Sequence, residues 1–294
     1  GFTHNFGTPL AQGIWSEIFN HRTVQNTPRV RELMLENFDY ELVYFEILEG
    51  DYDDEEKDAI SDGVNSAYES IDAQIRAYNW QPGSSFPVNL NRLNKFISLF
   101  YDKNIHGFVF TLNQDLFVER RFLSEEMPVI PGILNNPDWF TSRFSTALSQ
   151  GELCKLPNDT ELKAMITKLS SLRKFFYIKL HGSSNWVDSS GNRKMVVGRG
   201  KEEVIQKEPL LKWYFDIFKG VLFQPERRLL IVGYGFGDGH INKILAEAVT
   251  GYGLKIYIVN PTSPEEHYRS LAVTSGADRI DIWSGLSGYY PYTL

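Results

Sequence analysis

Residues 228–260 read RLLIVGYGFGDGHINKILAEAVTGYGLKIYIVN and carry the clearest structural pattern in the chain. The runs RLLIVGYG and LKIYIVN have the composition of buried strands, and HINKILAEAV between them has apolar residues at helical spacing. Further along, PEEHYRSLAV predicts a helix and RIDIWSG predicts a final strand. Strands and helices that alternate at this length are typical of a parallel sheet covered by helices on both faces. The sequence therefore predicts an α/β fold with a doubly wound parallel sheet.

The preceding residues add strands to this sheet and interrupt it with helices. After a glycine loop and helix at the start of the chain, helical spacing dominates much of the first third. We interpret residues 1–294 as a single domain with helical insertions near 23–90 and 121–174. The predicted strands are HGFVFTLNQDLF (106–117), FFYIKLHG (175–182) and a small one in KMVVG (194–198), and the predicted helices fall in 27–78, 89–103, 161–174 and 208–222.

Composition excludes several classes of protein. Of 294 residues, 42% are hydrophobic, which is enough for a sizeable core. The net charge of −7 and the lack of a basic stripe argue against direct binding of nucleic acid. No apolar run approaches the roughly 20 residues that span a bilayer. Cys154 is the single cysteine, which excludes an internal disulfide and any multi-cysteine metal site, and fits a reducing cytoplasm.

Polar residues and glycines follow each of four predicted strands. In a parallel sheet the carboxyl ends of the strands share one edge, and ligands bind in the crevice beyond that edge. Each residue also has an ordinary explanation, such as a turn or a helix cap. Together they predict a nucleotide pocket, because glycines admit a pyrophosphate and a histidine can accept a proton near neutral pH. The residues are Asn113 and Asp115, then His181 and Gly182, then Gly233, Gly235 and Asp238, and finally Asn260.

Five motifs, in order along the chain, resemble the NAD-binding motifs of sirtuins. GFTHNFGTP (1–9) resembles the sirtuin glycine loop, although the opening Gly-Ala is missing and Thr3 stands in the serine position. TLNQD (111–115) resembles T-x-N-x-D, and KLHGSSNW (179–186) resembles the segment with the catalytic histidine. GYGFGD (233–238) and VNP (259–261) resemble the two late nucleotide-binding loops. The chain is most similar to the SIR2-like proteins of bacterial anti-phage defence systems, which implies a Rossmann-like sheet.

The resemblance implies roles for nine residues in binding and cleaving NAD, with no metal. Asn113 would contact the nicotinamide ribose and place the attacking water, Asp115 would support that end of the pocket, and His181 would be the catalytic histidine. The remaining residues would hold the nucleotide: Gly1, Phe2 and Thr3 at the pyrophosphate and ribose, and Gly233, Gly235 and Asn260 on the adenosine side.

Two departures from the sirtuin pattern favour hydrolysis over deacylation. Sirtuin deacylases carry Asp-Phe-Arg after the loop proline, whereas Leu10, Ala11 and Gln12 follow Pro9 here. They also usually carry a four-cysteine zinc ribbon, which a chain with Cys154 alone cannot form. Without an acyl acceptor, water is the natural nucleophile, and the products are nicotinamide and ADP-ribose. Two alternatives stay open: a non-catalytic module that binds NAD or ADP-ribose, and an NAD-dependent protein deacylase.

The resemblance also implies a biological setting. Members of this group deplete cellular NAD on phage infection and are held silent otherwise. We therefore expect a cytoplasmic homo-oligomer, or a complex with a partner such as a HerA-type ATPase, a prokaryotic Argonaute or a fused sensor region. The abrupt start at Gly1 and the final segment GLSGYYPYTL are compatible with further residues at either end.

Overall fold

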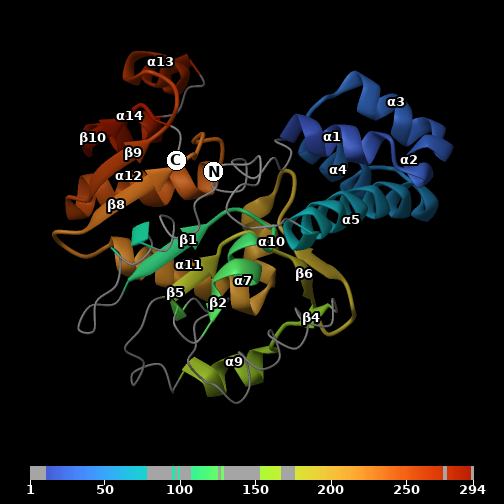
Figure 1. Cartoon of the computed structure of the whole chain (residues 1–294), viewed down its shortest axis with the longest axis horizontal. Helices are drawn as coiled ribbons and strands as arrows, with labels where there is room; N and C mark the ends of the chain where they lie inside the picture. The colour runs from blue at the N-terminus through green and yellow to red at the C-terminus, as the bar shows by residue number, and fades with distance from the viewer. Residues whose placement is uncertain are drawn as a thin grey trace. The chain divides into compact units, whose positions relative to one another are not determined.

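The structure is a computed structural model of the chain, and it divides into two units (Figure 1). Phe6–Tyr214 form one unit, here called the N-terminal unit. Phe215–Leu294 are assigned together with Gly1–Asn5 to the other, here called the C-terminal unit. The prediction of one domain over residues 1–294 stays a prediction. The structure describes residues 11–77, 95–96, 99, 107–124, 127–128, 153–166, 176–273 and 277–292.

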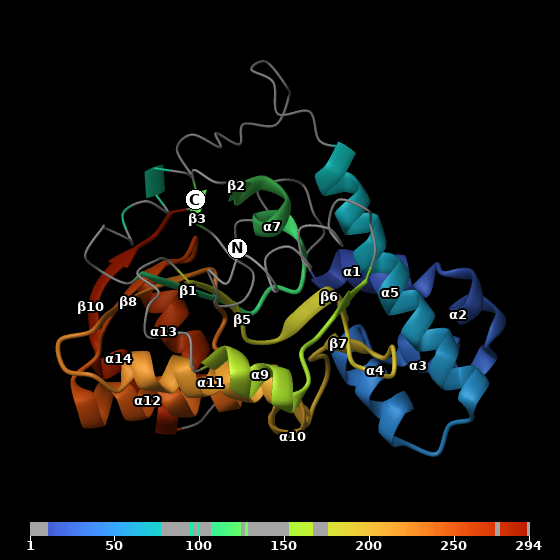
Figure 2. The ribbon, with the colours of Figure 1, turned by 90° about the horizontal axis from the view of Figure 1, so that it is seen from below.

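The C-terminal unit contains the alternating strands and helices that residues 228–260 predict. Its three strands are parallel and follow the order β10-β9-β8, with β9 in the centre. The apolar face of α12 and alternate residues of β9 form its core, which includes Leu245, Ile256 and Ile258. Figures 1 and 2 show α12 and α14 beside this sheet. The elements are β8 (Arg228–Val232), α12 (Gly239–Tyr252), β9 (Lys255–Val259), α13 (Pro264–Val273), α14 (Ala277–Ser284) and β10 (Leu286–Tyr290).

The prediction that RIDIWSG forms the final strand is wrong. Residues 279–284 belong to α14, and the last strand is β10, which follows it. A short run with alternating apolar residues is compatible with either structure, and tertiary packing decides between them. Here Ile282 is buried while Ile280 is 60% exposed, and α14 contacts α12.

Residues 11–77 of the N-terminal unit form five packed helices, and the helical pattern predicted for residues 27–78 is confirmed as far as Ala77. The long helix α5 contacts the other four helices. Gly63 on α5 permits this packing, because a Cβ there would lie 3.0 Å from side-chain carbons of Ile18 and Val24. Residues 78–90 of the predicted insertion lie outside the described residues. The helices are α1 (Ala11–Phe19), α2 (Arg22–Asn26), α3 (Pro28–Glu36), α4 (Tyr40–Glu49) and α5 (Asp54–Ala77).

The rest of this unit contains short sheets and helices. β1 (Phe108–Thr111) pairs in parallel with β5 (Phe176–Lys179). Both strands and their parallel direction agree with the prediction from the sequence. β6 (Gly182–Val187) was not predicted, because its GSSNWV sequence is polar, yet all six of its residues are buried. It pairs with β4 and β7. The other elements are α7 (Phe117–Phe122), β2 (Leu123–Ser124), β3 (Met127–Pro128), β4 (Cys154–Lys155), α9 (Asp159–Ile166), β7 (Arg193–Met195), α10 (Lys201–Lys207) and α11 (Pro209–Leu222), which continues into the C-terminal unit.

The structure thus shows a mixed α/β protein with parallel strand pairs, while the doubly wound arrangement stays a prediction. The described residues place β1–β5 and β10-β9-β8 in separate sheets. Much of the predicted insertion at 121–174 lies outside the described residues, although α9 confirms a helix within 161–166.

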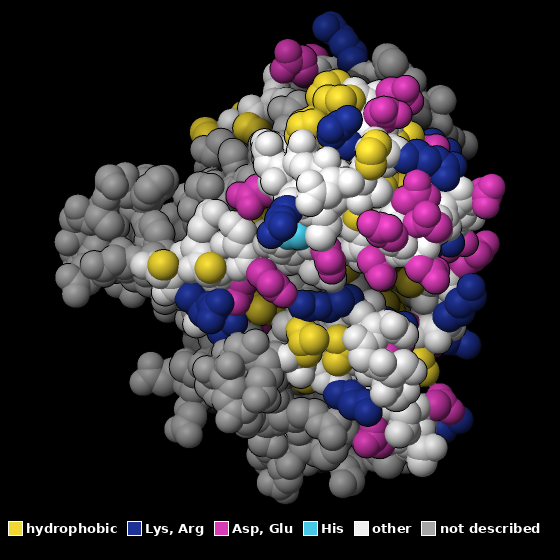
Figure 3. Space-filling model, turned by 90° about the vertical axis from the view of Figure 1, so that its right-hand side faces the viewer, with side chains coloured by type: hydrophobic (Ala, Val, Ile, Leu, Met, Phe, Trp, Pro, Cys, Tyr) yellow, Lys and Arg dark blue, Asp and Glu magenta, His cyan; other side chains and the backbone are white. Residues whose placement is uncertain are grey.

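Surface charges of both signs alternate on the face drawn in Figure 3. There, Lys and Arg side chains lie between Asp and Glu side chains across the described part of the surface. Among the described residues, Arg29 forms an ion pair with Glu56 at 3.3 Å. Within the described ranges, no helix is long and apolar enough to cross a membrane.

Candidate functional site

Three predicted site residues lie at one edge of the β1–β5 pair in the N-terminal unit. The two strands are parallel and in register, with Thr111 opposite Lys179. Asn113 and Asp115 follow the carboxyl end of β1, and His181 follows the carboxyl end of β5. The predicted placement of these residues is therefore confirmed within this unit, while their chemical roles stay a prediction.

The segment Leu112–Leu116, here called the β1 loop, presents Asn113 at the surface. The Asn113 backbone N–H donates to Thr111 Oγ1 over 3.1 Å, and its side chain is exposed. The Asp115 Oδ1 atom accepts a hydrogen bond of 2.9 Å from the Phe117 N–H at the start of α7. Asp115 therefore makes the side-chain to backbone hydrogen bond that is typical of an Asx turn.

Gln114 is the buried centre of this loop, and the sequence interpretation passed over it. Its Oε1 accepts a 2.6 Å hydrogen bond from the Tyr68 hydroxyl on α5, and its Nε2 donates to the Val196 carbonyl over 2.8 Å. Its own carbonyl accepts from the Ser184 N–H over 2.9 Å. These bonds tie the β1 loop to the helical insertion and to the strand after His181. The sequence signal that could have identified Gln114 was its position between the candidate residues Asn113 and Asp115.

His181 lies in the turn from β5 to β6 and is 3% exposed. Its carbonyl accepts a 2.9 Å hydrogen bond from the Val196 N–H. The next residue, Gly182, has φ +72°, a left-handed backbone conformation that favours glycine. This hydrogen bond and the conformation of Gly182 fix the backbone of the buried turn, and thereby the position of the His181 side chain.

The C-terminal unit places its predicted residues at the carboxyl ends of β8 and β9. The Gly233 N–H donates to the Val259 carbonyl over 3.2 Å, so the loop after β8 begins beside the end of β9. Asn260 follows directly, and its Oδ1 accepts from the N–H and hydroxyl of Thr262 at 3.0 and 2.7 Å. That is the turn interaction expected of an Asn-Pro pair.

The segment Gly233–Asp238, here called the glycine loop, is held in shape by two side chains. The Tyr234 hydroxyl donates to Asn242 Oδ1 over 3.0 Å and lies 3.2 Å from the Asp238 carbonyl. Asn242 Nδ2 donates to the Phe236 carbonyl over 2.9 Å. Phe236 is fully buried with φ +54°, a conformation that non-glycine residues seldom adopt. Such backbone conformations tend to occur in functional loops.

Gly235 and Gly237 face open space. A Cβ at either position would meet no atom of the structure's described part within 4 Å, and both residues are exposed. Packing among the described residues therefore does not require glycine here. Space beside the backbone is what a bound pyrophosphate needs. α12 begins at Gly239, directly after the loop, and the first N–H groups of a helix favour an anion.

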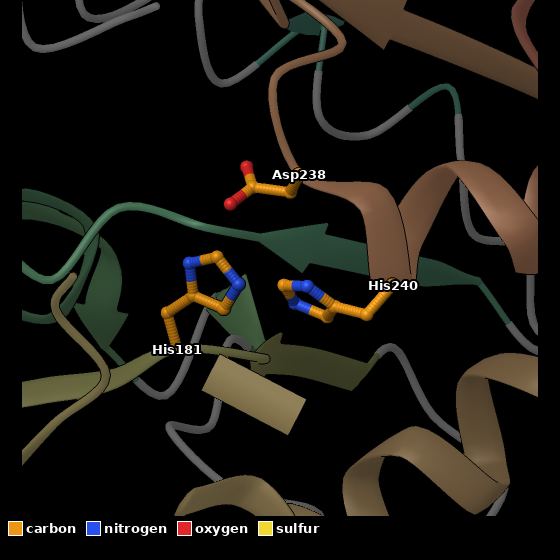
Figure 4. Close-up of side chains that lie close together, drawn as sticks. All are labelled: His181, Asp238 and His240. Carbon is orange, nitrogen blue, oxygen red and sulfur yellow. The ribbon is translucent and has the colours of Figure 1, made fainter. Parts of the chain in front are cut away.

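Figure 4 shows His181 where β5 passes towards β6, and Asp238 and His240 at the start of α12. Asp238 occupies the N-cap position of that helix. His240 was not predicted as a site residue, and its ring lies 5.6 Å from that of Phe215. Gly1, Phe2 and Thr3, the predicted pyrophosphate loop, lie outside the described residues.

Part of the chain is matched by a known protein family. The family model of the SIR2-like domain matches residues 107–280, which run from the start of β1 into α14. This region is more than half of the chain and contains both the β1 loop and the glycine loop. No curated protein matches the chain.

Proposed function

We propose that this chain, which belongs to the SIR2-like domain family, hydrolyses NAD⁺ to nicotinamide and ADP-ribose. SIR2-like domains use NAD. The observation that carries the proposal is that Asn113 and His181 follow the carboxyl ends of the two neighbouring parallel strands β1 and β5. An amide and an imidazole at this edge are groups that can orient water and accept its proton.

In the proposed reaction the bond between the ribose anomeric carbon and the nicotinamide nitrogen breaks. Its electron pair stays with nicotinamide, which leaves as a neutral base, and a water oxygen bonds to the anomeric carbon. Asn113 orients that water, and His181 accepts the released proton directly or through a ribose hydroxyl. Asp115 supports the β1 loop around Asn113. The site must exclude other water and hold the ribose in a reactive position.

The nucleotide half of the substrate would bind to the glycine loop and to the other residues that the family motifs assign to it. Gly233 and Gly235 would admit the phosphates and adenosine, supported by the open space beside Gly235. The amide of Asn260 would contact the adenosine side, and Gly1, Phe2 and Thr3 would complete the pyrophosphate site. The assignments of these residues rest on their resemblance to family motifs.

Water is favoured as the acceptor because the features of a deacylase are missing from the sequence. Pro9 is followed by Leu10, Ala11 and Gln12 rather than Asp-Phe-Arg. The one cysteine, Cys154, is buried in the short strand β4. That no metal takes part stays a prediction.

The biological setting that we propose is depletion of NAD during phage infection. A homo-oligomer, or a partner such as a HerA-type ATPase, would then control the activity. These proposals rest on the resemblance to defence proteins of the SIR2-like type.

The test is to incubate purified protein with NAD⁺ and follow nicotinamide and ADP-ribose by chromatography. Asn113→Ala and His181→Ala should each lower the turnover number at least about 100-fold, the usual size of a general acid–base effect. Asn20→Ala, which removes an exposed amide on α1's C-terminal side, is the matched control and should keep wild-type turnover. Circular dichroism should show that all three variants fold.

Three outcomes separate the alternatives. Unchanged turnover in both Asn113→Ala and His181→Ala would overturn the residue assignment. Tight binding of ADP-ribose without release of nicotinamide, even with candidate partners present, would favour a binding module. Formation of O-acyl-ADP-ribose from an acylated peptide would favour a deacylase.

A further inference from the structure

A buried ion pair lies directly behind the β1 loop. Lys179 on β5 and Glu119 on α7 are joined at 2.7 Å between Nζ and Oε1, and their side chains are 0% and 2% exposed. Lys179 Nζ also donates to the Asp115 carbonyl in the β1 loop. Lys179 therefore connects strand β5, the β1 loop and α7 through one ammonium group.

Stability alone does not explain why this pair is there. Removing two charges from water is costly, and apolar residues of similar volume often stabilise a fold as well or better. The other residues of β5, Phe176, Tyr177 and Ile178, are buried and mainly apolar, so an apolar side chain would fit the strand's pattern. Glu119 Oε2 has no hydrogen-bond partner in the part of the chain that the structure describes. The pair is thus incompletely compensated, and burial raises the pKa of Glu119 despite the nearby Lys179 ammonium.

The bond to Asp115 gives Lys179 a task that no apolar side chain can perform. The Asp115 carbonyl is partly buried and therefore gains from a protein donor, and Lys179 supplies a charged one. Asp115 is two residues after Asn113, and between them Gln114 is held by Tyr68 and Val196. With the Asp115 carbonyl also held, the backbone on the C-terminal side of Asn113 is fixed to β5.

We propose that Lys179 is a positioning residue for the hydrolysis of NAD, which anchors the β1 loop so that Asn113 is held beside the end of β5. Glu119 compensates the charge of Lys179 and does not itself hold the loop. This inference rests on the proposed function, in which Asn113 orients the attacking water. It assigns to the lysine of KLHG a role distinct from that of His181.

The decisive variant replaces the pair with apolar residues, Lys179→Met with Glu119→Leu. Its turnover number should fall at least about tenfold, while KM for NAD⁺ and binding of ADP-ribose stay within about twofold, because the anchor acts on the reacting end. Glu119→Gln keeps Lys179 in place and should retain turnover within about threefold. Lys163→Met, which breaks the exposed ion pair with Asp159, is the matched control and should behave as wild type.

Hydrogen–deuterium exchange tests the anchor independently of activity. In the double variant, amides of residues 112–117 should exchange at least about tenfold faster than in the wild type, while those of β9 stay unchanged. Wild-type turnover and wild-type exchange in the double variant would overturn the inference. A loss of turnover in Glu119→Gln as large as that in the double variant would also overturn it, because the ion pair would then act through its charge balance. If the double variant fails to fold, the turnover of Glu119→Gln is the deciding measurement. If wild-type protein releases no nicotinamide, the proposed function fails, and exchange at 112–117 still tests the anchor.

Discussion

Gly182 and Gly191 share a left-handed backbone but differ in their surroundings. Their φ angles are +72° and +90°. A Cβ on Gly182 would lie 2.0 Å from the Lys194 carbonyl oxygen, whereas one on Gly191 would meet no described atom within 4 Å. Gly182 therefore permits β7 to approach the chain immediately after His181, and Gly191 only permits a turn.

Alanine at these two positions should separate the two effects. Gly191→Ala should lower the free energy of unfolding by about 1–2 kcal/mol, the cost of a left-handed conformation. Gly182→Ala should cost clearly more, because the backbone of β7 must also move, and it should lower NAD turnover by displacing His181. Urea unfolding and nicotinamide release measure the two quantities. Equal losses of stability in the two variants would contradict the close packing at Gly182.

At the scale of elements, the junction of β8 and α12 is stabilised mainly by polar side chains. Tyr234 and Asn242 bind the backbone of the glycine loop at Phe236 and Asp238. The Phe236 ring contributes by packing against Tyr234 at 4.8 Å and His267 at 5.6 Å. Hydrogen bonds and ring contacts thus support the loop that carries the exposed glycines.

Tyr234→Phe should loosen the glycine loop without removing its aromatic packing. Because the hydroxyl's bonds to Asn242 and Asp238 are lost, the free energy of unfolding should fall by about 1 kcal/mol. Binding of ADP-ribose should weaken several-fold, with little change in turnover number at saturating NAD⁺. Tyr252→Phe, at a 41% exposed site on the same unit, is the matched control. Isothermal titration with ADP-ribose gives the comparison, and equal affinities in the two variants would contradict the prediction.

At the scale of the whole molecule, His267 links folding to pH. It is 6% exposed, and the rings of Phe236, Trp283 and Tyr289 lie 5.6, 6.1 and 5.7 Å from its own. Burial lowers the pKa of this imidazole below the ordinary value of 6.5. The unfolded chain therefore binds a proton at a pH where the folded chain does not, and stability falls as pH drops below about 6.5.

His267→Phe should remove this part of the pH dependence while keeping an aromatic ring in place. Urea unfolding of both proteins between about pH 7.5 and about pH 5.5 gives the comparison. The wild type should lose more stability on acidification, with a difference in slope of at most about 1.4 kcal/mol per pH unit. The raised pKa values of Glu119 and Glu208 act with the opposite sign, but equally in both proteins. Parallel pH curves would show that His267 does not titrate in this range.

Local patterns in the sequence determined the strands β1, β5, β8 and β9, the helices between residues 27 and 77, and the placement of Asn113, His181 and Gly233 after strand ends. These features depend on residue spacing within one element, which the sequence records directly. Motif order likewise indicated the SIR2-like family, which the match to residues 107–280 confirms.

Only the tertiary structure decided which side chains support those residues. Gln114 meets partners 46 and 82 residues away in the chain, and Lys179 meets Glu119 across 60 residues. The same holds for α14, which forms a helix where local alternation predicts a strand, and for β6, whose polar residues are buried by its neighbours. Contacts between residues so far apart leave no periodic signal in the sequence, because they depend on which elements the fold brings together.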